Sequence, residues 1–241
     1  MRNFEGMKTE EYLDSTYLKT AEQSNVSEEE NKINIIHVIK ESIQNNFKLV
    51  MIRPKYVSLA KQMISESNSE VLVGTVIDFP FGNGTTEQKI KEANEVISLG
   101  ADDLDFVCDY NLFKQCSFDK FDVDIFEGTK IGLDNNKTVK WIIETGALSK
   151  GEIKSITKRI SKIVTENFPE LEDNVFIKTS TGYYGGFGAT VSDVKLMKSV
   201  SGKLLIKASG GVSNFKEFEK IIEAGATRVG TSKALNIYLK K

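Results

Sequence analysis

The feature that most limits the fold of this chain is a regular alternation of short apolar runs with amphipathic helical segments. Eight runs begin near Tyr12, Lys48, Val71, Asp103, Thr138, Asn174, Lys203 and Thr227. Strict alternation of strands and helices predicts parallel strands joined by right-handed crossovers. Eight such units in 241 residues fit an α/β fold, a closed (β/α)8 TIM barrel that fills 1–241 as a single domain. An open doubly wound sheet is the competing architecture.

The helical segments carry start and stop signals. Three of them open with a capping box, in which two side chains satisfy free backbone N–H groups: Ser27 with Glu30, Thr85 with Gln88, and Ser149 with Glu152. Gly100 and Gly225 lie where helices should stop. After Thr85, the residues Ile90, Ala93 and Ile97 share one face, which predicts the side of that helix that packs on the sheet.

Composition excludes several functional classes. The formal net charge is −2, from 32 basic and 34 acidic residues, so nothing favours nucleic acid or an acidic membrane as a partner. No stretch reaches the roughly 18 apolar residues of a membrane span, and the polar start is not a secretory signal. Cys108 and Cys116 form no CxxC pair, which argues against a disulfide framework or a zinc site. A cytoplasmic location is therefore expected.

Two lysines stand where strands should end. Lys178 closes the run 175-VFIK-178, Lys207 closes 204-LLIK-207, and small residues and glycines follow both. Active sites of (β/α)8 barrels lie at the C-terminal ends of the strands. An amine in an apolar barrel mouth, next to a second cation, loses its proton easily and becomes a nucleophile able to form a Schiff base. The alternative for either lysine alone is an ordinary strand-end side chain that reaches solvent.

Three carboxylates interrupt or end apolar runs: Asp14, Asp105 and Glu144. Asp105 lies between Leu104 and Phe106, where an ionised side chain requires a cationic partner. A barrel interior with Lys140, Lys178 and Lys207 would supply one. These carboxylates would move protons or hold a lysine, and the alternative is a structural ion pair.

Glycine-rich turns follow the last three strands. Gly182 is expected after the sixth, Gly210 and Gly211 after the seventh, and Gly230, Thr231 and Ser232 after the eighth. Barrels often bind phosphate at such loops through backbone N–H groups, so the pattern predicts a phosphate ester as ligand. The only histidine, His37, is expected on a helix surface, which argues against a Ser-His-Asp hydrolase. No GxGxxG follows the first strand, so a dinucleotide cofactor is not expected.

Several of these segments closely resemble deoxyribose-phosphate aldolase, a class I, Schiff-base-forming aldolase. The resemblance runs from about Tyr12 to about Leu235 and is carried by LDSTYLKT, GTVIDFPFGNGTTEQKIKEA, WIIETGALS, FIKTSTGYYGGFGATVSDVKLM and IKASGGVSNFKEFEKIIEAGATRVGTS. It implies reversible cleavage of 2-deoxy-D-ribose 5-phosphate to acetaldehyde and D-glyceraldehyde 3-phosphate, in deoxyribonucleoside catabolism. It also implies no metal and no organic cofactor, and a small sugar phosphate as the partner.

The resemblance assigns roles residue by residue. Lys178 matches the Schiff-base lysine, Lys207 the lysine that helps to keep it unprotonated, and Asp105 the aspartate that moves protons with a water. Asp14 and Lys140 match the polar network of the substrate site. The phosphate-binding loops match Gly182, Gly210, Gly211 and Ser232. Met51 departs from the family, because many members carry a cysteine there.

Two other functions stay open at this point. Another Schiff-base barrel aldolase, of the transaldolase or fructose-bisphosphate type, would keep Lys178 and the phosphate loops. A non-catalytic barrel that binds sugar phosphates would need no nucleophile, so Lys178, Lys207 and Asp105 together argue against it. The apolar helix faces could serve a homodimer, although packing on the barrel explains them.

Overall fold

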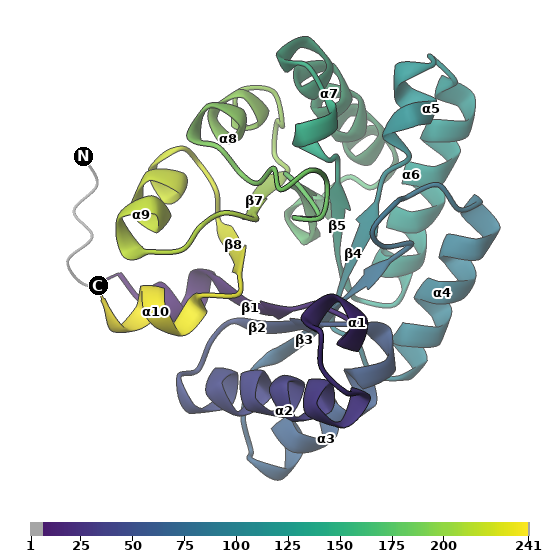
Figure 1. Cartoon of the computed structure of the whole chain (residues 1–241). Coiled ribbons are helices and arrows are strands. Elements are labelled where there is room, and N and C mark those ends of the chain that lie inside the picture. The colour runs from purple at the N-terminus through teal and green to yellow at the C-terminus, as the bar shows by residue number, and fades with distance from the viewer. Residues whose placement is uncertain (1–6, 241) are drawn as a thin grey trace.

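A computed structural model describes residues 7–240, in which the eight strands form one closed parallel barrel in chain order (Figure 1). The strands are β1 (Leu13–Tyr17), β2 (Leu49–Ile52), β3 (Leu72–Ile77), β4 (Asp103–Val107), β5 (Thr138–Ile142), β6 (Val175–Lys178), β7 (Leu205–Ser209) and β8 (Arg228–Thr231). Pairing of β1 with β8 closes the barrel, with Asp14 opposite Gly230. The predicted (β/α)8 TIM barrel is thus confirmed over the open sheet.

The helices form a layer outside the strands (Figure 1). They are α1 (Ala21–Ser24), α2 (Glu28–Gln44), α3 (Val57–Glu66), α4 (Thr86–Ser98), α5 (Tyr110–Lys114), α6 (Phe118–Asp134), α7 (Lys150–Asn167), α8 (Val191–Lys198), α9 (Phe215–Glu223) and α10 (Ala234–Leu239). Short 3-10 turns occur at η1 (Thr9–Tyr12), η2 (Pro54–Tyr56), η3 (Thr145–Ala147) and η4 (Glu172–Asn174). The predicted capping boxes are present at the starts of α2, α4 and α7.

The core between strands and helices is built from outward-facing strand residues. Trp141 of β5 is fully buried, stacks on Phe106 with a centroid distance of 4.9 Å, and donates from Nε1 to Thr129 Oγ1 at 2.9 Å. A Cβ on Gly128 of α6 would lie 2.6 Å from the Trp141 ring. Gly128 therefore lets α6 approach the sheet closely enough to cover this large apolar side chain.

The buried face of α4 matches the predicted one in part, since Ala93 is fully buried and Ile97 packs against the core. Lys89, Ala93 and Val96 are its buried residues, whereas Ile90 and Ile97 are only half-buried. Lys89 can replace an apolar residue because its ammonium pairs with Asp124 of α6 at 2.5 Å. A buried charge is tolerated when it is paired, so the ion pair allows Lys89 to lie on the buried face of the helix together with Ala93.

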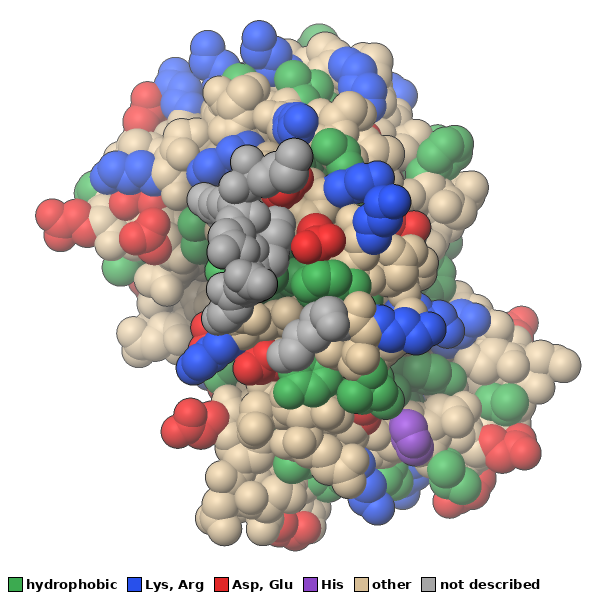
Figure 2. Space-filling view, turned by 90° about the vertical axis from the view of Figure 1, so that its left-hand side faces the viewer, with side chains coloured by type: hydrophobic (Ala, Val, Ile, Leu, Met, Phe, Trp, Pro, Cys, Tyr) green, Lys and Arg blue, Asp and Glu red, His purple; other side chains and the backbone are tan. Residues whose placement is uncertain are grey.

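The molecular surface gives little functional signal. His37 of α2 is exposed, as predicted, and Figure 2 shows the single histidine at the surface in purple. Basic and acidic side chains both occur on the face drawn there. None of the helices between residues 7 and 240 is long and apolar enough to cross a membrane.

Candidate active site

The two sides of the barrel interior differ in chemistry. Residues alternate between the faces of a strand, so every second residue points inward. On β2 and β3 these residues are apolar or glycine, and Leu49, Met51 and Val76 pack with Leu18 in a small cluster of their own. On the remaining strands the interior holds ionisable side chains, all buried: Asp14, Asp103, Asp105, Lys140, Lys178, Lys207 and Arg228.

Lys178 is the last residue of β6 and lies directly opposite Lys207 of β7 in the strand register. Its side chain is 2 % exposed, and its Nζ donates to Asp105 Oδ2 at 2.8 Å. Lys207 Nζ donates to the same oxygen at 2.8 Å, so the two amines share one acceptor. Burial lowers the pKa of Lys178 to about 8; Asp105 opposes this shift, and Lys207 and Lys140 add to it. The free amine needed for attack on a carbonyl is thus accessible near neutral pH.

Lys140 of β5 has a different environment, although it is equally buried. Its Nζ donates to Asp103 Oδ2 at 2.6 Å and to Asp105 Oδ1 at 2.9 Å. Burial works against the charged form, but the two carboxylates outweigh it and raise the pKa of Lys140. The ammonium also lies 5.8 Å from the centre of the Phe176 ring. Lys140 is therefore a charged member of the network and not a nucleophile.

The carboxylates stay ionised because of their neighbours. Burial by itself raises the pKa of Asp105, yet Lys140, Lys178 and Lys207 together hold it well below the usual range. Burial is likewise outweighed at Asp14, whose pKa is lowered by Arg228 and Lys207. Lys207 Nζ lies 2.7 Å from Asp14 Oδ2 as an ion pair that lacks hydrogen-bond alignment.

Two members of this network, Asp103 and Arg228, were not predicted from the sequence. Arg228 of β8 donates from Nε to Asp14 Oδ1 at 2.7 Å and from Nη2 to Asp103 Oδ2 at 3.4 Å. Arg228 faces inward opposite Lys207. The sequence pattern indicates the orientation of both residues. Asp103 lies two positions before Asp105, and Arg228 lies two positions before Gly230, so each shares the strand face of that residue.

Glu144, just beyond β5, is 2 % exposed and adopts a left-handed backbone with φ of 56°. Its Oε2 accepts from Thr181 N at 3.1 Å and from Thr181 Oγ1, whereas Oε1 has no hydrogen-bond partner among the described residues. Burial raises the pKa of Glu144, and the hydrogen bonds from Thr181 and the charge of Lys178 act in the opposite direction. Glu144 thus ties the end of β5 to the loop after β6.

A cleft of about 640 Å³ lies at the barrel mouth. It is lined by residues of four loops, and among them are Gly182, Gly210, Gly211 and Ser232. The three glycines have φ values of 79°, 84° and 79°, which strain other residues. Lys19 and Lys233 also line this cleft and were not predicted. Two lysines and open backbone N–H groups suit an anionic ligand.

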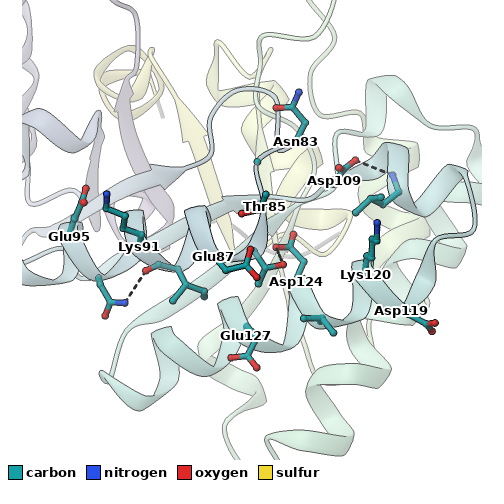
Figure 3. A pocket seen from close by; sticks show the side chains of 16 residues that line it. Asn83, Thr85, Glu87, Lys91, Glu95, Asp109, Asp119, Lys120, Asp124 and Glu127 are labelled. Atoms are coloured by element: carbon teal, nitrogen blue, oxygen red, sulfur yellow. Dashed lines mark hydrogen bonds between the residues drawn. The ribbon is translucent and has the colours of Figure 1, made fainter.

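A larger groove of about 1260 Å³ lies outside the barrel, between α4 and α6 (Figure 3). Its labelled side chains include Glu87, Lys91 and Glu127, and none of the residues named above as candidates lines it. Among residues 7–240, no group of three or more His, Cys, Asp or Glu side chains is suited to hold a metal ion. The barrel interior and the mouth cleft are therefore the candidate active site.

Comparisons with known proteins agree on one family. Deoxyribose-phosphate aldolase 1 of Staphylococcus aureus (strain MSSA476) is 40% identical over 232 residues, which is 96% of each chain. The deoxyribose-phosphate aldolase of Staphylococcus saprophyticus is 41% identical with the same coverage. No protein-family model matches the chain.

Solved structures give the same picture. QR15, an aldolase, superimposes with a TM-score of 0.79 at 32% identity and covers 95% of this chain and 93% of its own. A deoxyribose phosphate aldolase from Aeropyrum pernix, described as having a unique tetrameric structure, gives a TM-score of 0.77 at 23% identity, covering 96% and 91%. This second likeness supports the fold alone.

Proposed function

This chain belongs to the deoxyribose-phosphate aldolase family, and we propose that it cleaves 2-deoxy-D-ribose 5-phosphate reversibly through a Schiff base on Lys178. The products are acetaldehyde and D-glyceraldehyde 3-phosphate. The observation that carries the proposal is a buried strand-end amine with a pKa of about 8, which shares its acceptor, Asp105 Oδ2, with a second lysine. Such an amine is neutral often enough to attack an aldehyde.

The reaction begins when neutral Lys178 attacks C1 of the open-chain sugar. The resulting carbinolamine loses water, and Asp105, working with a bound water, moves the protons. The iminium then withdraws electrons from the C2–C3 bond. That bond breaks as the C3 hydroxyl loses its proton, which leaves an enamine on Lys178 and releases D-glyceraldehyde 3-phosphate. Protonation of the enamine at C2 and hydrolysis of the iminium release acetaldehyde and restore the amine.

The mouth cleft holds the other end of the substrate in this proposal. Gly182, Gly210, Gly211 and Ser232 bind the phosphate through backbone N–H groups and the hydroxyl, and Lys233 adds positive charge. Fixing the phosphate keeps C3 in register with the reacting amine, which supplies the entropic part of the catalysis. Asp14 and Lys140 hold the interior side chains in place below the substrate.

The test is reductive trapping. Borohydride is added with 2-deoxyribose 5-phosphate or, in a second arm, with fructose 1,6-bisphosphate, and the adduct is mapped by mass spectrometry. We expect a reduced adduct on Lys178 with the deoxyribose ester, and its loss in Lys178→Leu. The exposed Lys203 provides the matched control, because Lys203→Leu should label as the wild type does. An adduct only with the bisphosphate would assign a different aldolase, and no adduct at all would leave a sugar-phosphate binder.

Deoxyribonucleoside catabolism in the cytoplasm and a homodimeric assembly are further predictions from the sequence. The names of the staphylococcal relatives support deoxyribose phosphate as the substrate, and the catabolic role is what the resemblance of the sequence implies. The dimer is supported only by apolar side chains on the outer helices, such as the exposed Val123 of α6.

A further inference from the structure

The charged side chains of the barrel interior form a closed ring. Going round it, each cation contacts two carboxylates and each carboxylate contacts two cations. The order is Arg228, Asp14, Lys207, Asp105, Lys140, Asp103 and back to Arg228. The six contacts measure 2.7, 2.7, 2.8, 2.9, 2.6 and 3.4 Å in that order.

The ring is electrically neutral without Lys178. Three carboxylates balance three cations, and Lys178 is attached from outside through Asp105 Oδ2, which already accepts from Lys207. A protonated Lys178 would therefore be a fourth cation facing three carboxylates inside an apolar barrel. Buried charge is costly unless it is balanced, and the cheapest release of the surplus is loss of one proton. Arginine holds its proton most firmly of these cations.

We propose that Arg228 and Asp103 are positioning residues that close this neutral ring and thereby make Lys178 the surplus amine that gives up its proton. The inference rests on the proposed function, because it concerns the protonation of the proposed nucleophile. Neither residue contacts Lys178 directly. Arg228 acts by satisfying Asp14, which leaves Lys207 to Asp105, and Asp103 acts by holding Lys140 beside Asp105.

The other groups that face Lys178 do not alter this balance. The strands β2 and β3 present apolar or glycine residues to the interior. Glu144, at the end of β5, is held by Thr181 in the loop after β6, and burial raises its pKa, which favours the uncharged form. The charges of β1, β4, β5, β7 and β8 are the six members of the ring. Lys178 thus responds chiefly to the net charge of the ring.

The test measures the pH dependence of Lys178 methylation by formaldehyde and cyanoborohydride, mapped by mass spectrometry. This reaction needs only an unprotonated amine, so it does not depend on the natural substrate. Arg228→Met leaves the ring with an excess carboxylate, and Lys178 should keep its proton. We expect its methylation at pH 7 to fall at least about tenfold and to recover near pH 10. Arg228→Lys should preserve most of the wild-type profile.

Asp103→Asn gives the opposite sign, because it leaves the ring with an excess cation. Its methylation profile should move to lower pH than that of the wild type. The double variant Arg228→Met/Asp103→Asn is neutral again and should return towards the wild-type profile. Arg159→Met, which removes a cation paired with Asp122 on the outer helices, is the matched control and should leave the profile unchanged. Circular dichroism of each variant checks the fold.

The outcomes are separable. Opposite shifts in the two single variants, with restoration in the double variant, support the ring. Shifts of the same sign, no shift, or a double variant worse than both would overturn it. If Arg228→Met fails to fold, Asp103→Asn and the double variant still decide the sign. Wild-type protein that is never methylated at Lys178 would instead contradict the proposed function.

Discussion

Two lysines on neighbouring strands of the barrel interior are equally buried, but their pKa values shift in opposite directions. Lys140 donates to two carboxylates, Asp103 and Asp105, and its pKa is raised. Lys178, on the next strand, shares a single oxygen of Asp105 with Lys207, and its pKa falls to about 8. Burial is common to both, so burial alone does not make a nucleophile. The number of carboxylates available to each ammonium decides which lysine stays charged and which becomes reactive.

Removal of Lys140 should have the largest effect on stability. Lys140→Met leaves Asp103 and Asp105 without their shared cation, and removal of one partner from a buried network costs about 3–5 kcal/mol of stability. Lys178→Met is the matched control, and its cost should be below about 1 kcal/mol because the ring stays neutral. Urea unfolding at pH 7 measures both. Equal costs for the two variants would mean that the two lysines are not electrostatically different.

The pH dependence of stability provides a second test of the difference between Lys178 and Lys140. The pKa of Lys178 is about 8 in the folded protein and 10.5 for an ordinary lysine. Between these values the unfolded chain binds a proton that the folded protein does not, so the contribution of Lys178 to stability rises with pH, by about 3 kcal/mol across this window. Below pH 8 both states are protonated, and the contribution is constant.

This contribution is isolated by subtracting the unfolding free energy of Lys178→Met from that of the wild type at each pH. The subtraction cancels the other titrating groups, including Lys140, whose raised pKa gives a contribution of the opposite sign. The difference should increase between pH 8 and 10.5. A flat or falling difference would show that Lys178 keeps an ordinary pKa in the folded protein.

The smallest effect is expected in the mouth cleft, where backbone conformation and not side-chain charge should control phosphate binding. Gly211 has a φ of 79° and open space around its Cβ position, so Gly211→Ala strains the backbone by about 1 kcal/mol without a clash. We expect KM for 2-deoxyribose 5-phosphate to rise about fivefold, as about 1 kcal/mol of binding is lost. Activity on unphosphorylated deoxyribose should not change.

Gly202 provides the control for that experiment. It also has a positive φ, of 57°, and lies just before β7, away from the mouth cleft. Gly202→Ala should therefore reduce stability by a similar amount and leave KM unchanged. If both variants raise KM equally, the effect of Gly211→Ala is on the fold and not on phosphate binding.

Much of the site was predictable because strand parity is written in the sequence. An apolar residue directly precedes each of five ionisable site residues, and all five are buried, as strand parity predicts for the barrel interior: Lys178, Lys207, Asp105, Asp14 and Lys140. Asp103 and Arg228 have the same parity, but each is the first residue of its strand. A prediction based on residues at the C-terminal ends of strands therefore does not include them.

The helix layer shows the limit of such patterns. The apolar stripe of Ile90, Ala93 and Ile97 predicted the buried face of α4 only in part: Ala93 is buried and Ile97 packs on the core, but Lys89 is also buried, through its pair with Asp124. These two residues are 35 positions apart in the chain, and each looks like a surface residue in its own helix. An amphipathic pattern cannot reveal a partner that another helix supplies.

Local patterns in the amino-acid sequence predict the barrel, the strands that carry Lys178, Lys207, Asp105, Asp14 and Lys140, and the inward direction of these side chains, because alternation and helix caps act over a few residues. The pairing of each carboxylate with its cations depends on the folded barrel. Asp105 and Lys207 are 102 residues apart, and Arg228 and Asp14 are 214 apart. Barrel closure brings them into contact, and the Coulomb energy between buried charges depends on that distance and not on position in the chain.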